Sequence, residues 1–325
     1  MNYQKLGRTG LKVSEICLGT MTFGDQVSES NAQEILGVAL DAGINFIDTA
    51  DIYADGRSEE IVGKLLKGRR DSVVLATKVG FKTGSGPNDI GLSRKHIMKA
   101  IEDSLLRLKT EYIDIYYAHL PDYDTPIQES LSTMDSLVRQ GKVRYIACSN
   151  FSAWQLCKAL WVCELHNLAR VECIEPPYNL LARDIEYELL PLCSSEAVGV
   201  CVYNPLAGGL LTGKYDPARL PASNTRFGFG STGEKYSKRY WSDINFRAIE
   251  GLELIAQKAG RNLTHFALAW ILNNKMVTSV ICGCSSTEQL RQNLGAIDMR
   301  LTEEELASCD EIWQMLSPPR FSYGR

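Results

Sequence analysis

The sequence predicts an α/β fold, a closed (β/α)8 barrel, and three observations support it. Short β-branched, apolar runs alternate with amphipathic segments along the chain. Three of these runs end on an ionisable side chain, namely Asp48, Lys78 and His119. The chain has 325 residues, enough for one barrel of about 250 residues with insertions. Two ordinary domains would also fit this length, but the regular alternation favours a single domain over residues 1–325.

The elements follow from the two periodicities, continuous apolar runs for buried strands and a 3.6-residue period for helices. Residues 3–13, with a turn at 7–10, indicate a β-hairpin before the barrel. We expect strands to end near Gly19, Asp48, Lys78, His119, Ser149, Glu175, Tyr203 and Cys282. We expect helices near residues 30–41, 58–66, 93–108, 127–140, 152–165, 186–195, 245–258 and 287–296.

Two further helices, near residues 264–273 and 302–315, exceed the eight-helix plan, and Thr302 followed by three glutamates is a capping signal for the second. The segment 206–241 after the seventh strand is rich in Gly, Ser and Thr and shows no clear period. A loop of that length in a compact domain is usually functional or disordered. Residues from about 316 to 325 form a C-terminal tail.

Composition excludes several classes of protein. The formal net charge is -4 with Lys and Arg scattered along the chain, so no basic patch for nucleic acid is indicated. Most of the ten cysteines lie in apolar runs, which favours buried, reduced thiols over a disulfide framework. The N-terminus lacks an apolar signal region and no run approaches the ~18 apolar residues of a membrane span. We therefore expect a cytoplasmic protein without a membrane partner; the sequence does not indicate its oligomeric state.

An acid, a base, a phenol and an imidazole are expected at one rim of the barrel: Asp48, Lys78, Tyr53 and His119. Active sites of such barrels lie at the carboxyl ends of the strands. A tyrosine with a pKa near ~10 is a poor proton donor or acceptor unless a cation stabilises its phenolate. Lys78 supplies that cation, and Asp48 keeps the lysine charged. With His119 orienting a carbonyl oxygen and Tyr53 as general acid, the set predicts carbonyl reduction by a hydride-donating cofactor.

With these residues in place, the chain resembles the aldo-keto reductase superfamily, whose catalytic Asp, Tyr, Lys and His fall on the same four positions. Six further segments resemble the family in the family's order: GINFIDTA at 43–50, LxRLxxxYID at 105–114, GKVRYI at 141–146, CSNF at 148–151, PYNLL at 177–181 and NPLAGGLLTGK at 204–214. The match covers roughly residues 3–315. It is most similar to the larger-barrel branch that includes bacterial general reductases and potassium-channel β subunits. The resemblance places the hairpin across the closed end of the barrel.

The resemblance implies a nicotinamide cofactor, with NADP(H) favoured and NAD(H) possible. Ser149 and Asn150 would bind the carboxamide, and Tyr203 would stack on the nicotinamide ring. Residues 204–208 and Lys214 would line the diphosphate, and residues that open the last helix would bind the adenosine end. The complete implied set is Gly19, Thr20, Met21, Asp48, Ser149, Asn150, Glu175, Tyr203, Asn204, Pro205, Leu206, Gly208, Lys214, Arg226, Gly283, Ser285, Gln289, Gln292 and Asn293. The alternative for Ser285 and Asn293 is simple helix capping.

The chain departs from the family at two places. Glu175 stands where the family usually has Gln; if ionised, it accepts from the carboxamide but cannot donate, and its charge would favour the oxidised cofactor. At the adenosine 2'-phosphate, several family branches carry Arg or Lys, whereas this chain has Ser285, Ser286 and Gln289. Arg226 and Arg291 are the candidates to compensate, which is why NADPH stays favoured.

Aromatic side chains at the inferred active face suggest an apolar or sugar-stacking pocket for a small carbonyl or alcohol substrate. These are Phe23, Phe81, Trp241, Phe321 and Tyr323, with Tyr53 and His119 also facing the substrate. The alternative is that the aromatic side chains only plug the barrel rim. Nothing in the sequence selects one carbonyl class over another.

Two other functions remain open at this point, and two more are disfavoured. A cofactor-sensing subunit with slow turnover is permitted by the resemblance to channel β subunits, and an enzyme working mainly in the alcohol-oxidising direction would use the same residues. A metal-dependent barrel hydrolase is disfavoured because His119 and Asp122 lack further nearby ligands. A triphosphate-binding loop at residues 208–214 is disfavoured because Tyr215 follows where Ser or Thr is needed. No metal site is therefore predicted.

Overall fold

The structure is a computed structural model that describes residues 1–223, 225–228 and 230–317. The chain divides into two compact units, which are described separately. Unit 1 comprises Met1–Pro176, Ile185–Tyr203 and Met276–Arg291, and unit 2 comprises Pro177–Asp184, Asn204–Lys275 and Gln292–Arg325. The expectation of a single domain stays a prediction.

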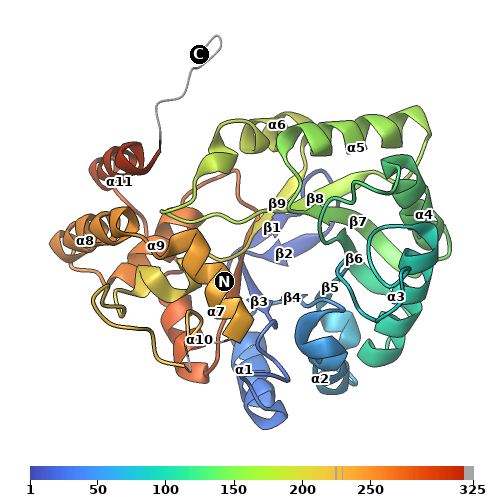
Figure 1. The fold of residues 1–325 in the computed structure, drawn as a ribbon, viewed down its shortest axis with the longest axis horizontal. Helices are drawn as coiled ribbons and strands as arrows, with labels where there is room; N and C mark the ends of the chain where they lie inside the picture. Colours follow the sequence, from blue (N-terminus) through green and yellow to red (C-terminus); the bar gives the residue numbers. More distant parts are fainter. Residues whose placement is uncertain (224, 229, 318–325) are drawn as a thin grey trace. The chain divides into compact units, whose positions relative to one another are not determined.

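Unit 1 contains a closed barrel of eight parallel strands, which confirms the predicted fold class (Figure 1). Its strands are β3 (Ile16–Gly19), β4 (Phe46–Asp48), β5 (Val74–Val79), β6 (Ile113–Ala118), β7 (Val143–Ser149), β8 (Val171–Glu175), β9 (Gly199–Val202) and β10 (Ser279–Gly283). They pair in chain order, and β10 closes the ring on β3 by pairing Val280 with Ile16. Every predicted strand end lies within one residue of the observed end.

Helices of unit 1 lie outside the ring of strands (Figure 1). They are α1 (Glu29–Asp41), α2 (Arg57–Leu65), α3 (Arg94–Leu108), α4 (Ile127–Arg139), α5 (Ala153–Leu165) and α6 (Leu189–Glu196), with short 3-10 turns η1 (Tyr53–Gly56) and η2 (Arg70–Ser72). A third such turn, η3 (Asp184–Glu186), crosses the unit boundary. Serine side chains cap α1 and α3, and Ser152 with Gln155 forms a capping box on α5. These caps satisfy amide groups that helix ends leave free.

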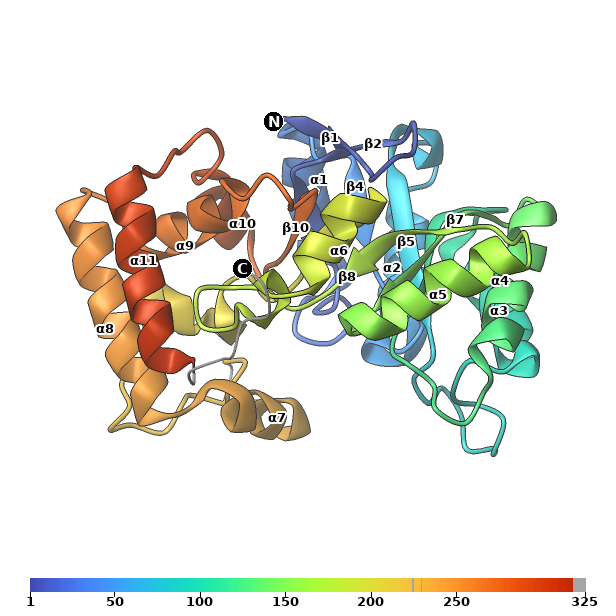
Figure 2. The same ribbon diagram turned by 90° about the horizontal axis from the view of Figure 1, so that it is seen from above.

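A hairpin of β1 (Tyr3–Lys5) and β2 (Lys12–Ser14) closes the amino-terminal end of the barrel, as predicted (Figure 2). Leu6 and Val13 are fully buried against the barrel core. The turn needs glycine at position 7, because its φ is 55° and a Cβ there would lie 2.5 Å from the carbonyl oxygen of Ala197. The hairpin thus covers this end of the barrel with apolar side chains.

Unit 2 is helical. Its elements are η4 (Ala207–Thr212), α7 (Gly230–Tyr240), α8 (Asp243–Lys258), α9 (Leu263–Leu272) and α11 (Glu303–Leu316), and α10 (Thr287–Leu294) crosses the boundary between the units. The extra helices predicted near 264–273 and 302–315 are α9 and α11, and Thr302 with Glu305 forms the expected capping box. Over the described residues, no helix is both long and apolar enough to cross a bilayer.

The expectation that residues 206–241 lack regular structure is wrong in part, because η4 and α7 lie within them. These residues are organised by aromatic contacts rather than by a periodic aliphatic stripe. The ring of Phe227 lies 6.0 Å from that of Tyr236 on α7, and the buried Tyr240 hydroxyl receives a hydrogen bond from Asn204 at 2.8 Å. Residues 318–325, with Phe321 and Tyr323, lie outside the described residues.

Candidate active site

Alternation along the barrel strands puts polar groups above an apolar interior. Residues two apart on a strand share a face. The core positions Phe46, Ala76, Tyr117, Ala147, Cys173 and Cys201 are each followed two residues later by Asp48, Lys78, His119, Ser149, Glu175 and Tyr203. Six strands or strand ends therefore deliver hydrogen-bonding groups to the carboxyl end of the barrel.

The Lys78 ammonium is the centre of this end and has no solvent exposure. Its Nζ donates to both carboxylate oxygens of Asp48, at 2.5 and 2.6 Å, and to the backbone oxygen of Thr49 at 3.0 Å. Burial disfavours the ammonium, but Asp48 and then Glu175 outweigh that penalty and raise the Lys78 pKa well above its ordinary value. The lysine therefore stays cationic, as the sequence predicted.

Tyr53 reaches this ammonium from the loop after β4, with its hydroxyl 3.4 Å from Nζ. It begins η1, where Ala54 and Asp55 have φ values of 50° and 55°. Left-handed backbone at residues other than glycine costs about 1–3 kcal/mol each, and such strain gathers at functional sites. The loop is thus held in a costly conformation where it presents the phenol.

The protonation of Tyr53 differs from the simplest expectation. Lys78 lowers the pKa of the phenol, but burial has the larger effect, and Asp48 and Glu175 add to it, so the net shift is upward. Tyr53 consequently keeps its proton at neutral pH. This state suits a proton donor and not a standing phenolate.

His119 follows β6 and lies beside Tyr53, with ring centroids 6.0 Å apart. Burial and then the charge of Lys78 lower its pKa well below the ordinary value, so the imidazole is neutral and carries one N–H donor. Its Nδ1 is buried without a hydrogen-bond partner among the described residues. Phe81 packs edge-on against the ring at 4.6 Å and is 40% exposed, where a ligand above His119 would contact it.

Ser149, Asn150 and Tyr203 form a connected set of hydrogen bonds at the same end of unit 1. The Asn150 amide donates to the backbone oxygen of His119 at 2.8 Å and to Ser149 Oγ at 3.0 Å, and its oxygen accepts from the Tyr203 hydroxyl at 2.8 Å. Asn150 has a φ of 62°, a conformation that asparagine tolerates better than most residues. Their predicted contacts with a carboxamide stay predictions.

Glu175 is 3% exposed, and its Oε2 lies 3.4 Å from Lys78 Nζ. The same oxygen accepts no hydrogen bond from the described residues. Burial, and next the charge of Asp48, raise the Glu175 pKa well above its ordinary value. This shift favours the protonated form of the carboxyl group. The predicted preference for the oxidised cofactor requires an ionised Glu175 and stays a prediction.

Other predicted cofactor positions of unit 1 belong to the loops after β3 and β10. Thr20 is fully buried and donates to the backbone oxygen of Asp48 at 2.9 Å, so it braces the end of β4. Ser285 and Gln289 bind each other, with Ser285 Oγ donating to Gln289 Oε1 at 3.1 Å. The Ser286 hydroxyl accepts a hydrogen bond from the backbone N–H of Gln289, near the start of α10. Gly19, Met21 and Gly283 occupy the same two strand ends.

In unit 2, Asn204 organises the predicted diphosphate segment. Its side-chain oxygen accepts from the Gly208 amide at 2.8 Å, and Gly208 has a φ of 70° with no room for a Cβ beside Tyr236. Burial lowers the pKa of Lys214. The Arg226 guanidinium lies over the Tyr236 ring. The remaining predicted positions of this unit are Pro205, Leu206, Trp241, Gln292 and Asn293, and all of these assignments stay predictions.

Two of the predicted substrate aromatics are packing residues in the structure. Phe23 is 1% exposed, so its ring is part of the core rather than an open surface. Trp241 packs in unit 2 against Tyr215, Phe227 and Phe246, at centroid distances of 5.6, 5.2 and 5.0 Å. Phe81 is the predicted aromatic that the structure places directly beside a catalytic candidate.

Sequence reasoning missed a second buried acidic group next to the site. Glu59 on α2 is fully buried and accepts from Thr77 at 2.6 Å and Arg107 at 2.7 Å. Asp51, in the loop after β4, is 4% exposed. Burial, and next the charge of Glu59, raise its pKa to about 8. The available signal in the sequence was a second carboxyl group three residues after Asp48, in the loop that also carries Tyr53.

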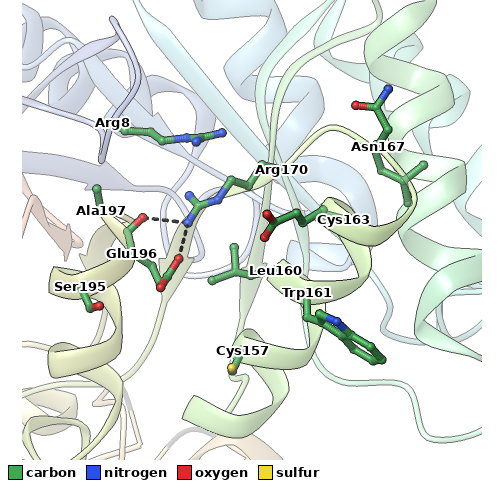
Figure 3. Close-up of a pocket in the computed structure, with 12 residues that line it drawn as sticks. Arg8, Cys157, Leu160, Trp161, Cys163, Asn167, Arg170, Ser195, Glu196 and Ala197 are labelled. Carbon is green, nitrogen blue, oxygen red and sulfur yellow. Dashed lines mark hydrogen bonds and ion pairs between the residues drawn. The ribbon is translucent and has the colours of Figure 1, made fainter.

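A pocket of about 580 Å³ lies elsewhere on unit 1, near the amino ends of β8 and β9 (Figure 3). Its arginines are already paired: Arg170 binds the backbone and side-chain oxygens of Glu196 at 2.7 and 3.2 Å, and Arg8 binds Glu172 at 3.3 Å. Its lining contains none of the four predicted catalytic residues. Over the described residues, no three His, Cys, Asp or Glu side chains are grouped as metal ligands.

Comparison with known proteins gives a consistent result across the chain. The sequence model of the Aldo/keto reductase family matches residues 15–314. A "Probable voltage-gated potassium channel subunit beta" of Oryza sativa subsp. japonica is 40% identical over 321 residues, which is 97% of each chain. A protein of the same description from Arabidopsis thaliana is 38% identical over 304 residues, 92% of each chain.

Proposed function

The chain belongs to the aldo/keto reductase family, as its segments indicated, and on that premise we propose that it reversibly reduces an aldehyde or ketone to an alcohol. The family supports NAD(P)H-dependent oxidoreduction in general. The observation that carries the finer proposal is the buried series Asp48, Lys78, Tyr53, in which a protonated phenol lies 3.4 Å from a lysine that remains cationic.

Each of the four residues has a separate task. When bound, a nicotinamide cofactor would supply the hydride for the carbonyl carbon. The Tyr53 hydroxyl donates its proton to the carbonyl oxygen, which becomes the alcohol. Lys78 offsets the negative charge left on Tyr53, and Asp48 fixes the ammonium in place through two hydrogen bonds. Neutral His119 donates a hydrogen bond that orients the carbonyl oxygen.

The residues of unit 1 fit a ligand at this end of the barrel. His119 Nδ1 and Glu175 Oε2 are buried polar atoms without hydrogen-bond partners among the described residues, and buried polar atoms are normally paired. Ser149, Asn150 and Tyr203 would hold the nicotinamide, and Glu175 in its protonated form would both donate and accept hydrogen bonds. NADPH is favoured over NADH, with Arg226 and Arg291 as its candidate partners, and a cytoplasmic location goes with this assignment.

A second candidate is a cofactor-sensing subunit that turns over slowly and regulates another protein. The names of the two relatives, potassium channel β subunits, favour it. Both candidates use the same Asp48, Lys78 and Tyr53 chemistry, so the rate of turnover separates them.

The test is NADPH consumption across a panel of aldehydes, ketones and keto-sugars, with NADH in parallel. Tyr53→Phe is the informative variant because it removes only the proton donor. We expect its turnover to fall about 10²–10⁴-fold while its NADPH affinity, measured by fluorescence, changes little. Tyr112→Phe is the matched control, since the Tyr112 hydroxyl binds Asp71 on the surface.

Equal turnover in Tyr53→Phe and the unaltered protein contradicts the assigned mechanism. Tight NADPH binding with negligible turnover on every carbonyl favours the cofactor-sensing subunit. Turnover seen only with alcohols and NADP+ places the physiological reaction in the oxidising direction.

A further inference from the structure

The backbone and the carboxyl group of Glu175 make different contacts, and only the carboxyl group belongs to the charged cluster around Lys78. The Ser149 hydroxyl and the backbone N–H of Asn150 donate to the backbone oxygen of Glu175, at 2.8 and 3.2 Å. The carboxyl group itself points to Lys78, with Oε2 at 3.4 Å from Nζ. The carboxyl group therefore affects its neighbours through its charge, which depends on whether it carries a proton.

One lysine cannot neutralise two carboxylates in this pocket. Lys78 already binds both oxygens of Asp48, so an ionised Glu175 would leave a net negative charge in a buried site, which is costly. The titratable groups that act on Glu175 or feel its charge come from six strands and one loop: Asp48, Lys78, Tyr53, Tyr117, Cys17, Cys173 and Cys201. Among these seven, Lys78 alone is cationic. The pocket therefore favours the protonated form of Glu175, in agreement with the upward direction of its pKa shift.

We propose that Glu175 sets the proton-donating strength of Tyr53 through the Lys78 ammonium that the two side chains share. Glu175 Oε2 and the Tyr53 hydroxyl each lie 3.4 Å from Nζ, so the two groups are at most twice that distance apart. When Glu175 is protonated, the Lys78 charge is available to stabilise a Tyr53 phenolate. When Glu175 ionises, its negative charge opposes that stabilisation. In this role Glu175 acts on Tyr53 through Lys78, as a positioning residue.

The proposal fixes the direction of a pH effect. In the unaltered protein, ionisation of Glu175 makes Tyr53 a weaker acid, so the phenol keeps its proton to higher pH. Glu175→Gln keeps the size of the side chain but never becomes negative, so Tyr53 loses its proton at lower pH. The alkaline limb of kcat for reduction and the acid limb for oxidation both move to lower pH. A like charge at this distance in a buried site corresponds to a shift of about one pH unit.

The strand offers a matched control. Glu172 lies three residues earlier on β8, at the opposite end of the barrel from Lys78, where it pairs with Arg8 and Arg170. Glu172→Gln makes the same chemical change on the same strand. We expect both limbs to stay in place in Glu172→Gln and to move by about one unit in Glu175→Gln. Coincident limbs in Glu175→Gln and the unaltered protein overturn the proposal.

A second readout does not depend on catalysis. The infrared spectrum at pH 7 should contain, besides the band expected from protonated Asp51, a C=O stretch of a protonated carboxyl group that is missing in Glu175→Gln and present in Glu172→Gln. If the unaltered protein lacks that band, the proposal is wrong whatever the turnover.

The proposal rests on the proposed function, and its failure can be told apart from failure of that function. Absence of all Tyr53-dependent turnover rejects the reductase. In that case tyrosinate absorbance, corrected with Tyr53→Phe backgrounds, replaces the pH limbs. Ionisation of Tyr53 at lower pH in Glu175→Gln supports the coupling, and any other result overturns it.

Discussion

The two ends of the barrel in unit 1 are built from opposite materials. At the amino end, the hairpin places Leu6 and Val13 against the core, and both are fully buried. At the carboxyl end, the barrel strands place Asp48, Lys78 and Glu175 in the interior, and these side chains are also buried. The amino end buries apolar side chains, and the carboxyl end buries ionisable ones.

The difference shows how stability and chemistry are separated within one fold. Burying apolar side chains lowers the free energy of the folded state by about 1.5–3 kcal/mol for each large residue. Burying charges is costly unless they are paired, and at the carboxyl end one ammonium serves two acids and a phenol. Changes at the amino end should alter stability alone, whereas changes at the carboxyl end should alter activity, its pH dependence or the pH dependence of stability.

The largest effect is expected for Lys78→Met. This change removes the charge that offsets the phenolate and leaves Asp48 without its partner, so kcat should fall by about 10³-fold or more. NADPH consumption under saturating conditions measures the loss. Lys99→Met is the control, because Lys99 is exposed on α3 and pairs with Asp103. Loss of activity in both variants alike would erase the distinction drawn between the charged end and the surface.

At the amino end, Leu6→Ala should destabilise the protein and spare its chemistry. Removing three carbon atoms from a fully buried site typically costs about 2–5 kcal/mol. Denaturant unfolding measures the change, and kcat of the remaining folded protein should be unaltered. Leu106→Ala is the control, since Leu106 is 77% exposed. A drop in kcat without a drop in stability would show that the two ends are not independent.

A smaller effect of opposite sign is expected for Asp51→Asn at the charged end. The Asp51 pKa is about 8 in the folded protein against 3.8 for an ordinary aspartate. The folded state therefore binds more protons than the unfolded chain between these values, and stability falls as the pH rises from about 4 to about 8. Asparagine never ionises, so the variant should be more stable at pH 8, by about 2 kcal/mol or more.

Unfolding free energies at pH 5 and pH 8 measure that prediction. The gain should be large at pH 8 and small at pH 5. Asp103→Asn, at a half-buried site on α3 where Asp103 pairs with Lys99, should show no such dependence. A variant that is less stable than the unaltered protein at pH 8 would mean that Asp51 is ionised and well paired there.

The sequence predicts the architecture well because local signals determine it. Apolar runs and capping residues predict strand ends to within one residue and bring Asp48, Tyr53, Lys78 and His119 to one end of the barrel. Helix α7 escaped prediction because aromatic contacts, such as Phe227 with Tyr236, organise it rather than a periodic apolar stripe.

The shifted pKa values could not be predicted from the sequence, because they depend on burial and on contacts between residues that are separated in the chain. The raised pKa of Glu175 depends on burial and on Asp48, which is distant in sequence. The raised pKa of Asp51 depends on burial and on Glu59. Neither the depth of burial nor the sum of several charges can be read from residue spacing, so these features required three-dimensional structure.

The central claim, that the charged end transfers a hydride to a carbonyl with Tyr53 as proton donor, has one most direct test. NADPH carrying deuterium at the transferred position is incubated with a carbonyl substrate, and the alcohol is analysed by mass spectrometry. The account predicts deuterium on the carbinol carbon, formed about 10²–10⁴-fold more slowly by Tyr53→Phe. Unlabelled alcohol, or labelled alcohol formed equally fast by both proteins, would contradict it.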